Sequence, residues 1–533
     1  MSAAEAAGGG AAGGGAAGRV QLSWPGETPK RVVDRLVADQ VASHIASRDA
    51  TLWGPAAADE AAIRLGWVDL YETSRPLLAE IEALDAELRA EGLDRIVLCG
   101  MGGSSLAPEV ITRTAGVDLT VLDTTDPAPI RRALSDRLDR TVVVVSSKSG
   151  TTVETDSQRR AFEQAFREAG IEPGSRMVAI TDPGSALAAA ATERGYRRVF
   201  LADPNVGGRF SALSAFGLVP SGIAGADVAA LLDDAAWVVS SLSGDEPDNP
   251  ALQLGAVLGA GEPADRGVVA PIVTSREIVG FADWAEQLLA ESTGKDGTGV
   301  LPVVVSSPNA AEVSDPSLGR YVPPIELSGP LGAQFLVWEW ATAVAGRVFG
   351  IDPFNQPDVE SAKKAARGFL DDRPEPEPPA FVDGAIEVRA TSGLLDGVTT
   401  VSGALDALVG RVDGYLAIMA YLDRTGDDAP LSALRETLGE RADRPTTFGW
   451  GPRFLHSTGQ YHKGGRPVGA FLQITGAVPE DLDVPNRPYT FGELITAQAA
   501  GDAKVLAEKG RPVLRLHLTD RTAGREQLLA SLA

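Results

Sequence analysis

The sequence of 533 residues predicts an α/β protein with tandem doubly wound parallel sheets and an additional α/β segment at the C-terminal end. From Arg95 onward, short runs of β-branched residues alternate with helical stretches, which indicates parallel strands joined by helices on both faces of a sheet. The same alternation starts again near Gly267. It starts a third time beyond "DDRPEPEPPA", an acidic and proline-rich stretch at 371–380 that is typical of a linker.

The first unit is predicted to contain five strands connected by four helices. The expected strands are Arg95–Cys99, Leu119–Leu122, Thr141–Val145, Met177–Ile180 and Arg198–Leu201. The expected helices lie within 106–115, 127–138, 153–170 and 185–195. Because parallel strands end at one edge of their sheet, we expect ligands at that edge.

The later units follow the same pattern with longer connections. The strands expected in the second unit are 267–273 and 300–306, with helices at 278–292 and 332–350, and those expected in the third are 415–422, 469–475 and 513–519. The predicted organisation is a disordered Gly/Ala tail (1–18), a helical N-terminal segment (19–92), a first unit (93–225), a second unit (226–370), a linker (371–385) and a C-terminal α/β subdomain (386–533).

Composition excludes several classes of function. The formal net charge is -24, which argues against binding of a nucleic-acid backbone. We expect no membrane span, because no apolar run approaches the roughly 20 residues that a membrane helix needs. The first residues show neither the basic region nor the apolar region of a secretory signal. Cys99 is the single cysteine, so no intrachain disulfide can form, and we expect a cytoplasmic protein.

The stretch "CGMGGSSLAPEV", at 99–110, places glycines between a strand and a helix. Such a turn lets main-chain amides surround an anion at the helix N-terminus. A dinucleotide-binding loop is the alternative, and Asp123 at the end of the next strand could pass for its ribose-binding acid. That fingerprint, however, needs a third glycine where Ser105 stands. A tight strand-to-helix turn without a ligand also fits the pattern.

The stretch "SSKSGTTVET", at 146–155, carries six hydroxyl side chains around Lys148, directly after a predicted strand. Capping a helix needs one hydroxyl, so a well-capped helix would explain only part of the pattern. Several hydroxyls at a helix N-terminus suit a group with three acceptor oxygens, such as a phosphate. The loops after two adjacent strands would then open on the same edge of the sheet.

Three further motifs hold residues with catalytic chemistry. Arg209 follows paired glycines in "NVGGRFSALSAFGL", Glu291 ends a helix in "AESTGKDGTG", and Gln356 and Lys363 are about two helical turns apart in "DPFNQPDVESAKK". A carboxylate such as Glu291 could act as a general base, and a guanidinium such as Arg209 stays charged. Taken one at a time, these residues also fit a surface arginine, a solvated helix end and an exposed amphipathic helix.

The segment "LHSTGQYHKGG", at 455–465, holds His456 and His462, two of only four histidines in the chain. Zinc binding is disfavoured, because neither a cysteine cluster nor a third ligand is nearby. A polar loop without catalytic function fits the segment equally well.

Read in order, the motifs resemble those of the phosphoglucose isomerase family, which is built from two sugar-isomerase (SIS) domains. The matching stretches are "GMGGSSLAP", "VLDTTDPAPI", "SSKSGTTVET", "VGGRFSALSAFGL", "ESTGK" and "NQPDVESAK", between Gly100 and Lys363. The resemblance implies that 93–225 and 226–370 are tandem SIS domains. The C-terminal α/β stretch resembles the form in which the isomerase is fused behind a transaldolase, but the segment before Arg95 is too short for a transaldolase barrel.

The resemblance implies a reversible isomerisation of glucose 6-phosphate and fructose 6-phosphate through a cis-enediol, with neither a cofactor nor a metal. Glu291 would be the base that moves a proton between C1 and C2. Arg209 would stabilise the enediolate, and Lys363, with Gln356 nearby, would assist ring opening. Glu154 would lie at the edge of the site. The residues implied for phosphate binding are Gly103, Ser104, Ser147, Lys148, Ser149, Thr151 and Thr152.

The chain departs from the common family pattern at one point. Most members carry a ring-opening histidine between the two motifs that here contain Glu291 and Lys363, and this chain has no histidine in that interval. Lys363 could open the ring alone, or the enzyme could rely on spontaneous opening in solution. Alternatively, His456 or His462 takes the role.

Other functions with the same fold remain open at this point. The chain could isomerise both glucose and mannose phosphates, or it could be a non-catalytic SIS protein that binds a phosphosugar and regulates. Glu291 and Lys363 argue against a pure binding protein, which needs the hydroxyls but no base. A nicotinamide-dependent oxidoreductase is disfavoured by Ser105. The family resemblance also implies a homodimer.

Overall fold

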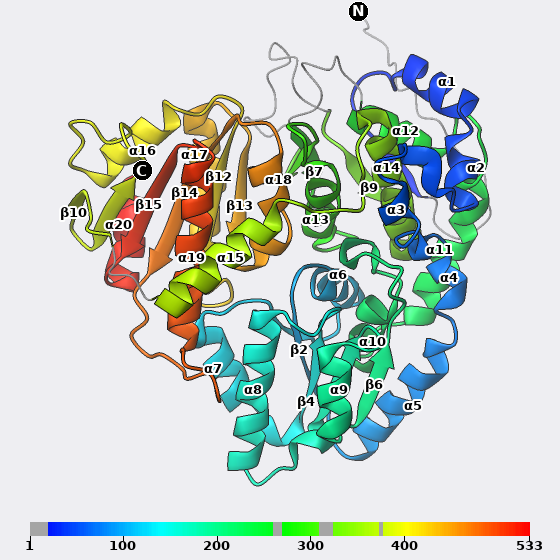
Figure 1. The fold of residues 1–533 in the computed structure, drawn as a ribbon, viewed down its shortest axis with the longest axis horizontal. Coiled ribbons are helices and arrows are strands. Elements are labelled where there is room, and N and C mark those ends of the chain that lie inside the picture. Colours follow the sequence, from blue (N-terminus) through cyan, green and yellow to red (C-terminus); the bar gives the residue numbers. More distant parts are fainter. Residues whose placement is uncertain (1–19, 260–268, 309–322, 373–376, 533) are drawn as a thin grey trace, which may run out of the picture.

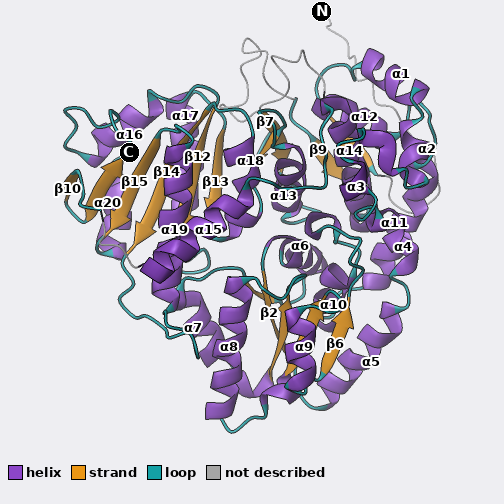
Figure 2. Cartoon of the chain, viewed as in Figure 1, coloured by secondary structure: helices purple, strands orange, loops and turns teal. Residues whose placement is uncertain are grey.

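The computed structural model describes residues 20–259, 269–308, 323–372 and 377–532. Its strands form separate sheets, and the helices pack around and between them (Figures 1 and 2). The predicted disordered tail, 1–18, lies outside the described residues. The following segment, 20–92, contains the short strand β1 (Gln21–Ser23) and several helices. Its helices are α1 (Lys30–Ala38), α2 (Val41–Ala46), η1 (Ala50–Trp53), α3 (Ala58–Ala61), η2 (Gly66–Asp69), α4 (Leu70–Thr73) and α5 (Leu77–Ala90).

The first sheet has five parallel strands in the order β3-β2-β4-β5-β6. The strands are β2 (Arg95–Gly100), β3 (Thr120–Leu122), β4 (Thr141–Ser146), β5 (Met177–Thr181) and β6 (Arg198–Leu201), each within one residue of the predicted bounds. Alternate residues of β4 enter two different cores, because Val142 and Val144 belong to one hydrophobic cluster and Val143 and Val145 to another. Both faces of the sheet are therefore covered, which explains the nearly continuous apolar strands.

The helices after these strands confirm the predicted alternation. They are α6 (Leu106–Ala115), α7 (Pro127–Ser135), α8 (Val153–Glu168), α9 (Ala186–Glu193) and α10 (Ala215–Ile223). Side chains cap several of them: Asp126 accepts from the amide of Ala128 at α7, and Ser185 accepts from Ala188 at α9. Such caps fix where a helix begins, because they satisfy amides that have no partner within the helix.

The second unit is more helical than the first. Its parallel strands are β7 (Val269–Val273) and β8 (Leu301–Val305), and Ile272 also forms a bridge with Ile325. Within the described ranges this sheet is thus smaller than the doubly wound sheet of the first unit. The helices are α11 (Val228–Leu242), α12 (Pro250–Gly259), α13 (Phe281–Thr293), α14 (Leu331–Phe349) and α15 (Val359–Asp372). A short strand, β9 (Glu326–Ser328), pairs antiparallel with β1 (Gln21–Ser23).

The third sheet has six strands in the order β10-β11-β15-β14-β12-β13. They are β10 (Phe381–Asp383), β11 (Ile386–Ala390), β12 (Tyr415–Tyr421), β13 (Thr446–Trp450), β14 (Gly469–Gly476) and β15 (Val513–Leu518). The last four run parallel to one another, while β11 is antiparallel to β15 and β10 to β11. The predicted linker, 371–385, therefore contains a strand of this sheet, and residues 373–376 lie outside the described ranges.

The C-terminal unit shares a hydrophobic core with the second unit. Ala417 and Met419, on one face of β12, belong to the same buried cluster as Val303 and Val305 of β8. The other face packs on helices of its own unit. The helices on that face are α16 (Val401–Val409), η9 (Ala429–Ala433), α17 (Leu434–Ala442) and α20 (Arg521–Ala530). The other helices of the unit, η10 (Arg453–His456), α18 (Gly459–Gly464) and α19 (Phe491–Glu508), contribute Phe454, Tyr461 and Ile495 to the cluster shared with β8. Helix α15 of the second unit lies across α19 of the C-terminal unit in Figure 1. The two units are therefore in direct contact.

None of the helices in the described ranges is long and apolar enough to cross a bilayer.

Candidate active site

The two predicted anion-binding loops lie side by side at the carboxyl edge of the first sheet. Strands β2 and β4 are neighbours, and Gly100 at the end of β2 pairs with Ser146 at the end of β4. The short helix η3 (Gly102–Ser104) follows β2, and the hydroxyl-rich loop follows β4. The Ser104 side chain is half-buried.

The loop after β4 is organised by its own hydroxyl groups. Ser147 Oγ accepts from the amide of Gly150 at 3.2 Å and donates to Thr152 Oγ1 at 3.2 Å. Ser149 Oγ and Thr151 Oγ1 are 2.8 Å apart. Thr152 is the N-cap residue of α8, but its side chain does not cap the helix. The first amides of α8 therefore have no side-chain cap, which leaves them available to an anion.

The ammonium group of Lys148 is occupied by hydrogen bonds within the protein. Its Nζ donates to the carbonyls of Pro204 at 3.0 Å and Val206 at 2.6 Å. Burial lowers the pKa of Lys148, and Asp182, 3.8 Å away, opposes this shift. The side chain thus ties the loop to the neighbouring turn, and the main-chain amide of Lys148 is the group that can serve an anion.

Gly103 allows η3 to contact the turn that precedes Arg209. A Cβ atom at Gly103 would lie 1.8 Å from the carbonyl oxygen of Gly208. No side chain fits at that distance, so the backbones of the two loops touch directly. This contact sets the position of the Arg209 loop, η6 (Gly208–Phe210), relative to the predicted phosphate loop.

Gly103→Ala is expected to lower kcat/KM for a phosphosugar about a hundredfold, because a displacement near 1 Å is enough to misalign a reacting group. The added methyl group should also destabilise the fold by about 2 kcal/mol. Steady-state kinetics and chemical denaturation measure the two effects. The matched control is Gly207→Ala, whose Cβ meets only Phe210, at 3.7 Å. Equal activity of the two variants would contradict the prediction.

The Arg209 side chain lies at the centre of the candidate site and is 3% exposed. Its Nη1 is 3.1 Å from Glu291 Oε1, and its Nε donates to Ser292 Oγ at 2.7 Å. Burial lowers the pKa of Arg209, and the carboxylate of Glu291 opposes that shift. The predicted base and the predicted enediolate-stabilising cation are therefore in direct contact.

Gln287, one turn before Glu291 on α13, joins the predicted base to the C-terminal unit. Its Nε2 donates to Glu291 Oε2 at 3.0 Å and to the main-chain carbonyl of His456 at 2.7 Å. Gly102 makes room for this arrangement, because a Cβ there would lie 2.8 Å from Gln287 Nε2 and 2.9 Å from the His456 carbonyl oxygen. Three elements that are distant in sequence thus meet at one point.

A turn after α14 closes the other side of Arg209. Gln356 Oε1 accepts from Arg209 Nη1 at 3.0 Å, and Pro353 O accepts from Nη2 at 2.7 Å. Lys295, which is 1% exposed, anchors the same turn through three short hydrogen bonds to Asp352 and Asn355. Burial and the neighbouring charge of Arg209 lower the pKa of Lys295 to about 7.

Lys363 lies on α15, after the turn that holds Gln356. Its side chain lies outside the described residues, so its predicted role in ring opening stays a prediction.

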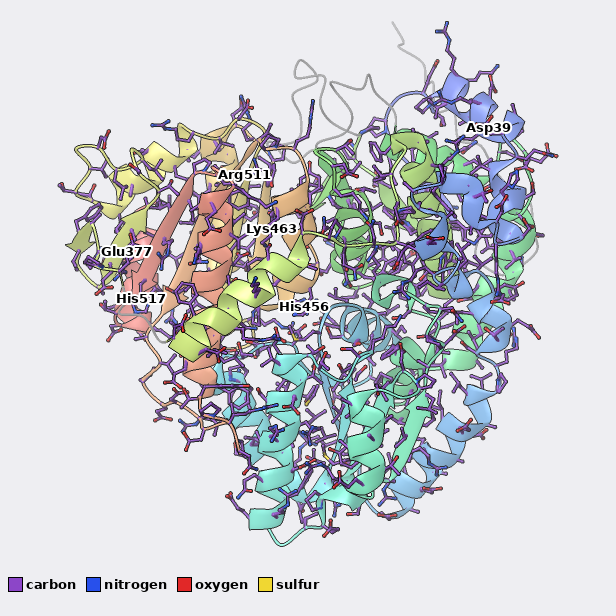
Figure 3. The ribbon with its side chains drawn as sticks, in the orientation of Figure 1. Asp39, Glu377, His456, Lys463, Arg511 and His517 are labelled. Carbon is purple, nitrogen blue, oxygen red and sulfur yellow. The ribbon has the colours of Figure 1, made fainter. Side chains whose placement is uncertain are left out.

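The two histidines of "LHSTGQYHKGG" have different environments. His456 Nε2 is 3.0 Å from Glu154 Oε1, and its side chain is 20% exposed. Figure 3 places His456 where the C-terminal unit meets the first unit. His462 is buried, stacks on Tyr415 and lies 3.1 Å from the hydroxyl of that tyrosine. Burial holds the pKa of His462 well below its usual range. The predicted alternative that uses His462 therefore does not fit its place in the core.

A cluster of ion pairs fixes the His456 segment to the first unit. Arg453, three residues before His456, contacts Glu109 Oε2 at 2.5 Å and Asp123 Oδ2 at 2.6 Å. Arg424 binds the same two carboxylates. Asp123 is thus fully engaged with arginines, which argues against the ribose-binding role considered from the sequence.

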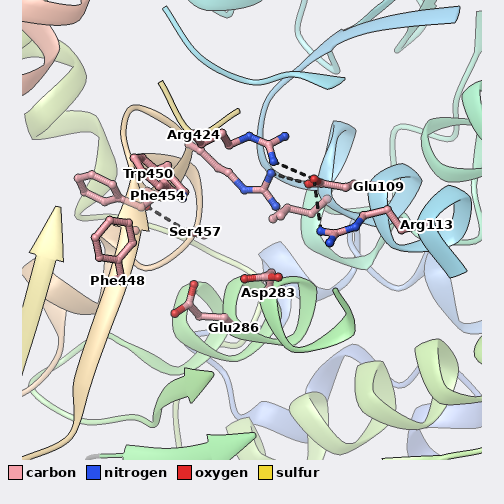
Figure 4. A pocket seen from close by; sticks show the side chains of 12 residues that line it. Glu109, Arg113, Asp283, Glu286, Arg424, Phe448, Trp450, Phe454 and Ser457 are labelled. Carbon is pink, nitrogen blue, oxygen red and sulfur yellow. Dashed lines mark hydrogen bonds and ion pairs between the residues drawn. The ribbon is translucent and has the colours of Figure 1, made fainter. Parts of the chain in front are cut away.

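The same ion pairs border a cavity of about 170 Å³ between α6, α13 and the C-terminal unit. Figure 4 shows Glu109 joined to the arginines on one side and Asp283 and Glu286 projecting from α13 on another. Phe448 and Trp450 form its aromatic wall. This cavity lies next to the candidate site, since Ser457, which follows His456, is one of its lining residues.

Glu109→Gln is expected to reduce the free energy of unfolding by about 3 kcal/mol at pH 7. Burial alone would raise the pKa of Glu109, but Arg453 and Arg424 overcome this effect and lower it to about 2. Because the folded-state pKa is depressed, the stabilisation is present above pH 4.5 and is lost as the pH falls from there towards 2. Denaturation of both proteins from pH 7 to pH 3 measures this.

The matched control is Asp85→Asn, which removes an exposed pair with Arg89 within one helix and should cost below about 1 kcal/mol. A stability difference between wild type and Glu109→Gln that stays constant with pH would contradict the assignment.

Several residues of the site were not predicted from the sequence. Ser292 and Lys295 stand within the "ESTGK" motif, and Gln287 lies one helical turn before it, so spacing along α13 could have indicated them. Gln498 on α19 donates to Glu154 at 2.7 Å, and nothing in its local sequence marks it. Within the described ranges, no three His, Cys, Asp or Glu side chains are grouped so that they could hold a metal ion.

Comparison with known proteins identifies the family. The family model described as Phosphoglucose isomerase matches residues 43–307. A relative from Natronomonas pharaonis, named "Probable glucose-6-phosphate isomerase", is 30% identical over 339 residues, which cover 52% of this chain and 79% of the relative. The glucose-6-phosphate isomerase of Rubrobacter xylanophilus is 29% identical over 382 residues, which cover 56% of this chain and 87% of the relative. A relative of the same name from Cyanothece is 35% identical over 218 residues, which cover 38% and 40%.

Among solved structures, a glucose-6-phosphate isomerase from Chlamydia trachomatis has a TM-score of 0.48 and 19% identity, over 65% of this chain and 84% of its own. A hypothetical protein from Thermus thermophilus has a TM-score of 0.45 and 20% identity, over 96% and 92%. The family assignment rests on the sequence matches rather than on these likenesses. The chain matches the family model over residues 43–307 and covers 79% of the Natronomonas relative, to which it is 30% identical. The chain therefore belongs to the phosphoglucose isomerase family.

Proposed function

We propose that this protein interconverts glucose 6-phosphate and fructose 6-phosphate through a cis-enediol intermediate. The observation that carries the proposal is the contact between Glu291 and Arg209, 3.1 Å apart at the edge of a loop pair suited to a phosphate. An aldose–ketose isomerisation needs one carboxylate to move a proton, one cation near the enediolate and one handle for the phosphate. The relatives named as glucose-6-phosphate isomerases support the same substrate pair.

The phosphate handle is proposed to be the pair of loops after β2 and β4. Ser104, Ser147, Ser149 and Thr152 would supply hydroxyl groups, and the amides near Lys148 and at the start of α8 would supply main-chain donors. Binding energy from this group, remote from the reacting carbons, can hold C1 and C2 against the base. The uncapped N-terminus of α8 favours the negative charge of the phosphate.

Ring opening is proposed to use His456 together with Glu154. The carboxylate accepts the hydrogen bond from Nε2, which assigns the proton of the neutral imidazole to that nitrogen and leaves Nδ1 as the basic atom. Nδ1 can then take the proton of the anomeric hydroxyl as the C1 carbonyl forms and the bond between C1 and the ring oxygen breaks, while the ring oxygen receives a proton from water. Lys363, on α15, can assist at the ring oxygen as the family resemblance implies. This arrangement replaces the histidine that most family members carry between the two motifs.

Isomerisation of the open chain then needs a single base. Glu291 removes the proton from C2 of the aldose, which forms the C1–C2 enediol, and returns it to C1 to give the ketose. O1 gains a proton and O2 loses one in the same conversion, so the carbonyl moves from C1 to C2. The charge that develops on the oxygens lies near the Arg209 guanidinium, whose other donors are fixed by Ser292 and Pro353. Such fixed donors stabilise the transition state without reorganising during the reaction.

The direct test follows glucose 6-phosphate formation from fructose 6-phosphate with a coupled dehydrogenase, in the presence of a chelator. Turnover that survives chelation supports the proposed reaction. If the wild-type protein shows no turnover with this substrate, the proposal is wrong, and mannose 6-phosphate identifies a different phosphosugar specificity. Turnover with both substrates would establish a dual isomerase, and binding without turnover a regulatory protein.

The family resemblance also leads us to propose that the protein acts as a homodimer in the cytoplasm. Light scattering coupled to size exclusion should give a mass near twice the 55.4 kDa of the chain. A mass equal to that of one chain would contradict the dimer.

A further inference from the structure

Gln498 lies at the contact between the C-terminal unit and the proposed ring-opening pair. It belongs to α19, which begins with a capping box between Thr490 and Glu493 and is therefore firmly placed. The side chain is 4% exposed. Its Nε2 donates to Glu154 Oε1 at 2.7 Å, the same oxygen that lies 3.0 Å from His456 Nε2.

The other end of the Gln498 amide is held by the first unit. Thr125, which is fully buried in the loop between β3 and α7, donates from Oγ1 to Gln498 Oε1 at 2.6 Å. This bond and the carboxylate together define the orientation of the amide, because a reversed amide would place its oxygen against the oxygen of Glu154. The amide of Gln498 is therefore a fixed donor aimed at one carboxylate oxygen.

We propose that Gln498 is a positioning residue, which holds the Glu154 carboxylate against His456 Nε2 and thereby keeps His456 in the tautomer and orientation needed for ring opening. This inference rests on the proposed function. The physical reason is that each fixed donor on a carboxylate oxygen restricts rotation of the carboxylate. The C-terminal unit then supplies both the histidine and the group that orients its partner.

The test replaces Gln498 with methionine, which keeps the length of the side chain and removes the donor. For cyclic glucose 6-phosphate, kcat is expected to fall about tenfold, the effect of losing one hydrogen bond to a charged group. Erythrose 4-phosphate cannot close into a ring, since the hydroxyl that would close it carries the phosphate. Exchange of its C2 proton with solvent deuterium, followed by NMR, is expected to change by less than about twofold.

A double-mutant cycle distinguishes positioning from general destabilisation. If Gln498 acts through His456, the effect of Gln498→Met should disappear in a His456→Ala background. Gln473→Met is the matched control, because Gln473 is 1% exposed and donates to the carbonyl of Ala499, next to Gln498, without reaching Glu154. The control should lose stability while keeping the ratio of the two activities.

Thr125→Val provides a second variant if Gln498→Met folds poorly. It removes the hydroxyl that holds Gln498 Oε1 and should give a smaller loss on the cyclic substrate in the same direction. Equal losses on both substrates, or losses that add fully to those of His456→Ala, would overturn the inference. If wild-type protein isomerises glucose 6-phosphate and Gln498→Met is unchanged, the inference fails and the proposed function stands. Absence of wild-type turnover would instead refute the proposed function.

Discussion

Glu291→Gln is expected to lower kcat for fructose 6-phosphate about a thousandfold with little change in KM, because it removes the proposed base and leaves the predicted phosphate loops intact. The amide keeps the shape of the side chain and can still contact Arg209 and Gln287, the neighbours of the carboxylate. The loss should therefore appear in the chemical step. Steady-state kinetics with the coupled assay measure it.

Glu286→Gln is the matched control for this variant. Glu286 lies on the same helix, α13, but borders the neighbouring cavity, and burial holds the pKa of its carboxyl well above the usual range. An amide is then a close replacement, so activity should stay within about twofold of wild type. Comparable losses in Glu286→Gln and Glu291→Gln would show that α13 as a whole, rather than the Glu291 carboxylate, is being perturbed.

His456→Ala is expected to lower kcat for cyclic glucose 6-phosphate about a hundredfold, because the proposed proton-transfer group for ring opening is lost. Solvent exchange of the C2 proton of erythrose 4-phosphate needs no ring opening and should change far less. The difference follows from the position of His456, whose Nε2 faces Glu154 while only its main-chain carbonyl contacts Gln287 near the base.

His462→Phe is the control for the histidine variant, since His462 packs against Tyr415 and Phe471 in the core. It should keep both activities and change mainly stability. Equal losses of His456→Ala on the cyclic and the acyclic substrate, or no loss at all, would remove His456 from ring opening. Spontaneous opening or Lys363 acting alone would then be the remaining explanations.

The first sheet could be predicted closely because its strands are strongly apolar and the chain alternates regularly between strand and helix. The central strands β2, β4 and β5 are buried along their whole length, which gives runs such as "TVVVV" at 141–145. Strands β11 and β13 were not predicted. Residues 386–390 alternate between apolar and charged side chains and 446–450 contain a glycine, so a five-residue signal was too short to stand out.

The C-terminal unit illustrates what local sequence cannot provide. Strand β10 lies within the predicted linker and was not predicted, because three residues beside a proline-rich stretch carry almost no periodic signal. Nor does periodicity tell which face of β12 packs on β8. That pairing depends on how the two units pack together, and it is the arrangement that brings His456 to the first unit.

One part of the candidate site could be predicted from local sequence, and the other part depends on how the units pack together. Ser147, Arg209 and Glu291 lie in short motifs at strand ends or helix ends, so their types and spacing indicate the chemistry. The contact of His456 with Glu154 joins positions 302 residues apart, and that of Gln498 with Glu154 joins positions 344 apart. Because the family's usual ring-opening histidine is missing, the sequence gives a reason to consider another histidine for that role. A glutamine in the middle of a helix gives no comparable signal.

We propose above that Glu291 moves a proton between C1 and C2 of an open-chain phosphosugar. The most direct test of this proposal is conversion of fructose 6-phosphate in deuterated water with a chelator present, followed by NMR of C2 in the glucose 6-phosphate formed. Wild-type protein should introduce solvent deuterium at C2 over repeated turnovers, because a proton held on a carboxylate exchanges with solvent, and Glu291→Gln should form almost no product. Product without any deuterium at C2, or undiminished conversion by Glu291→Gln, would contradict the account.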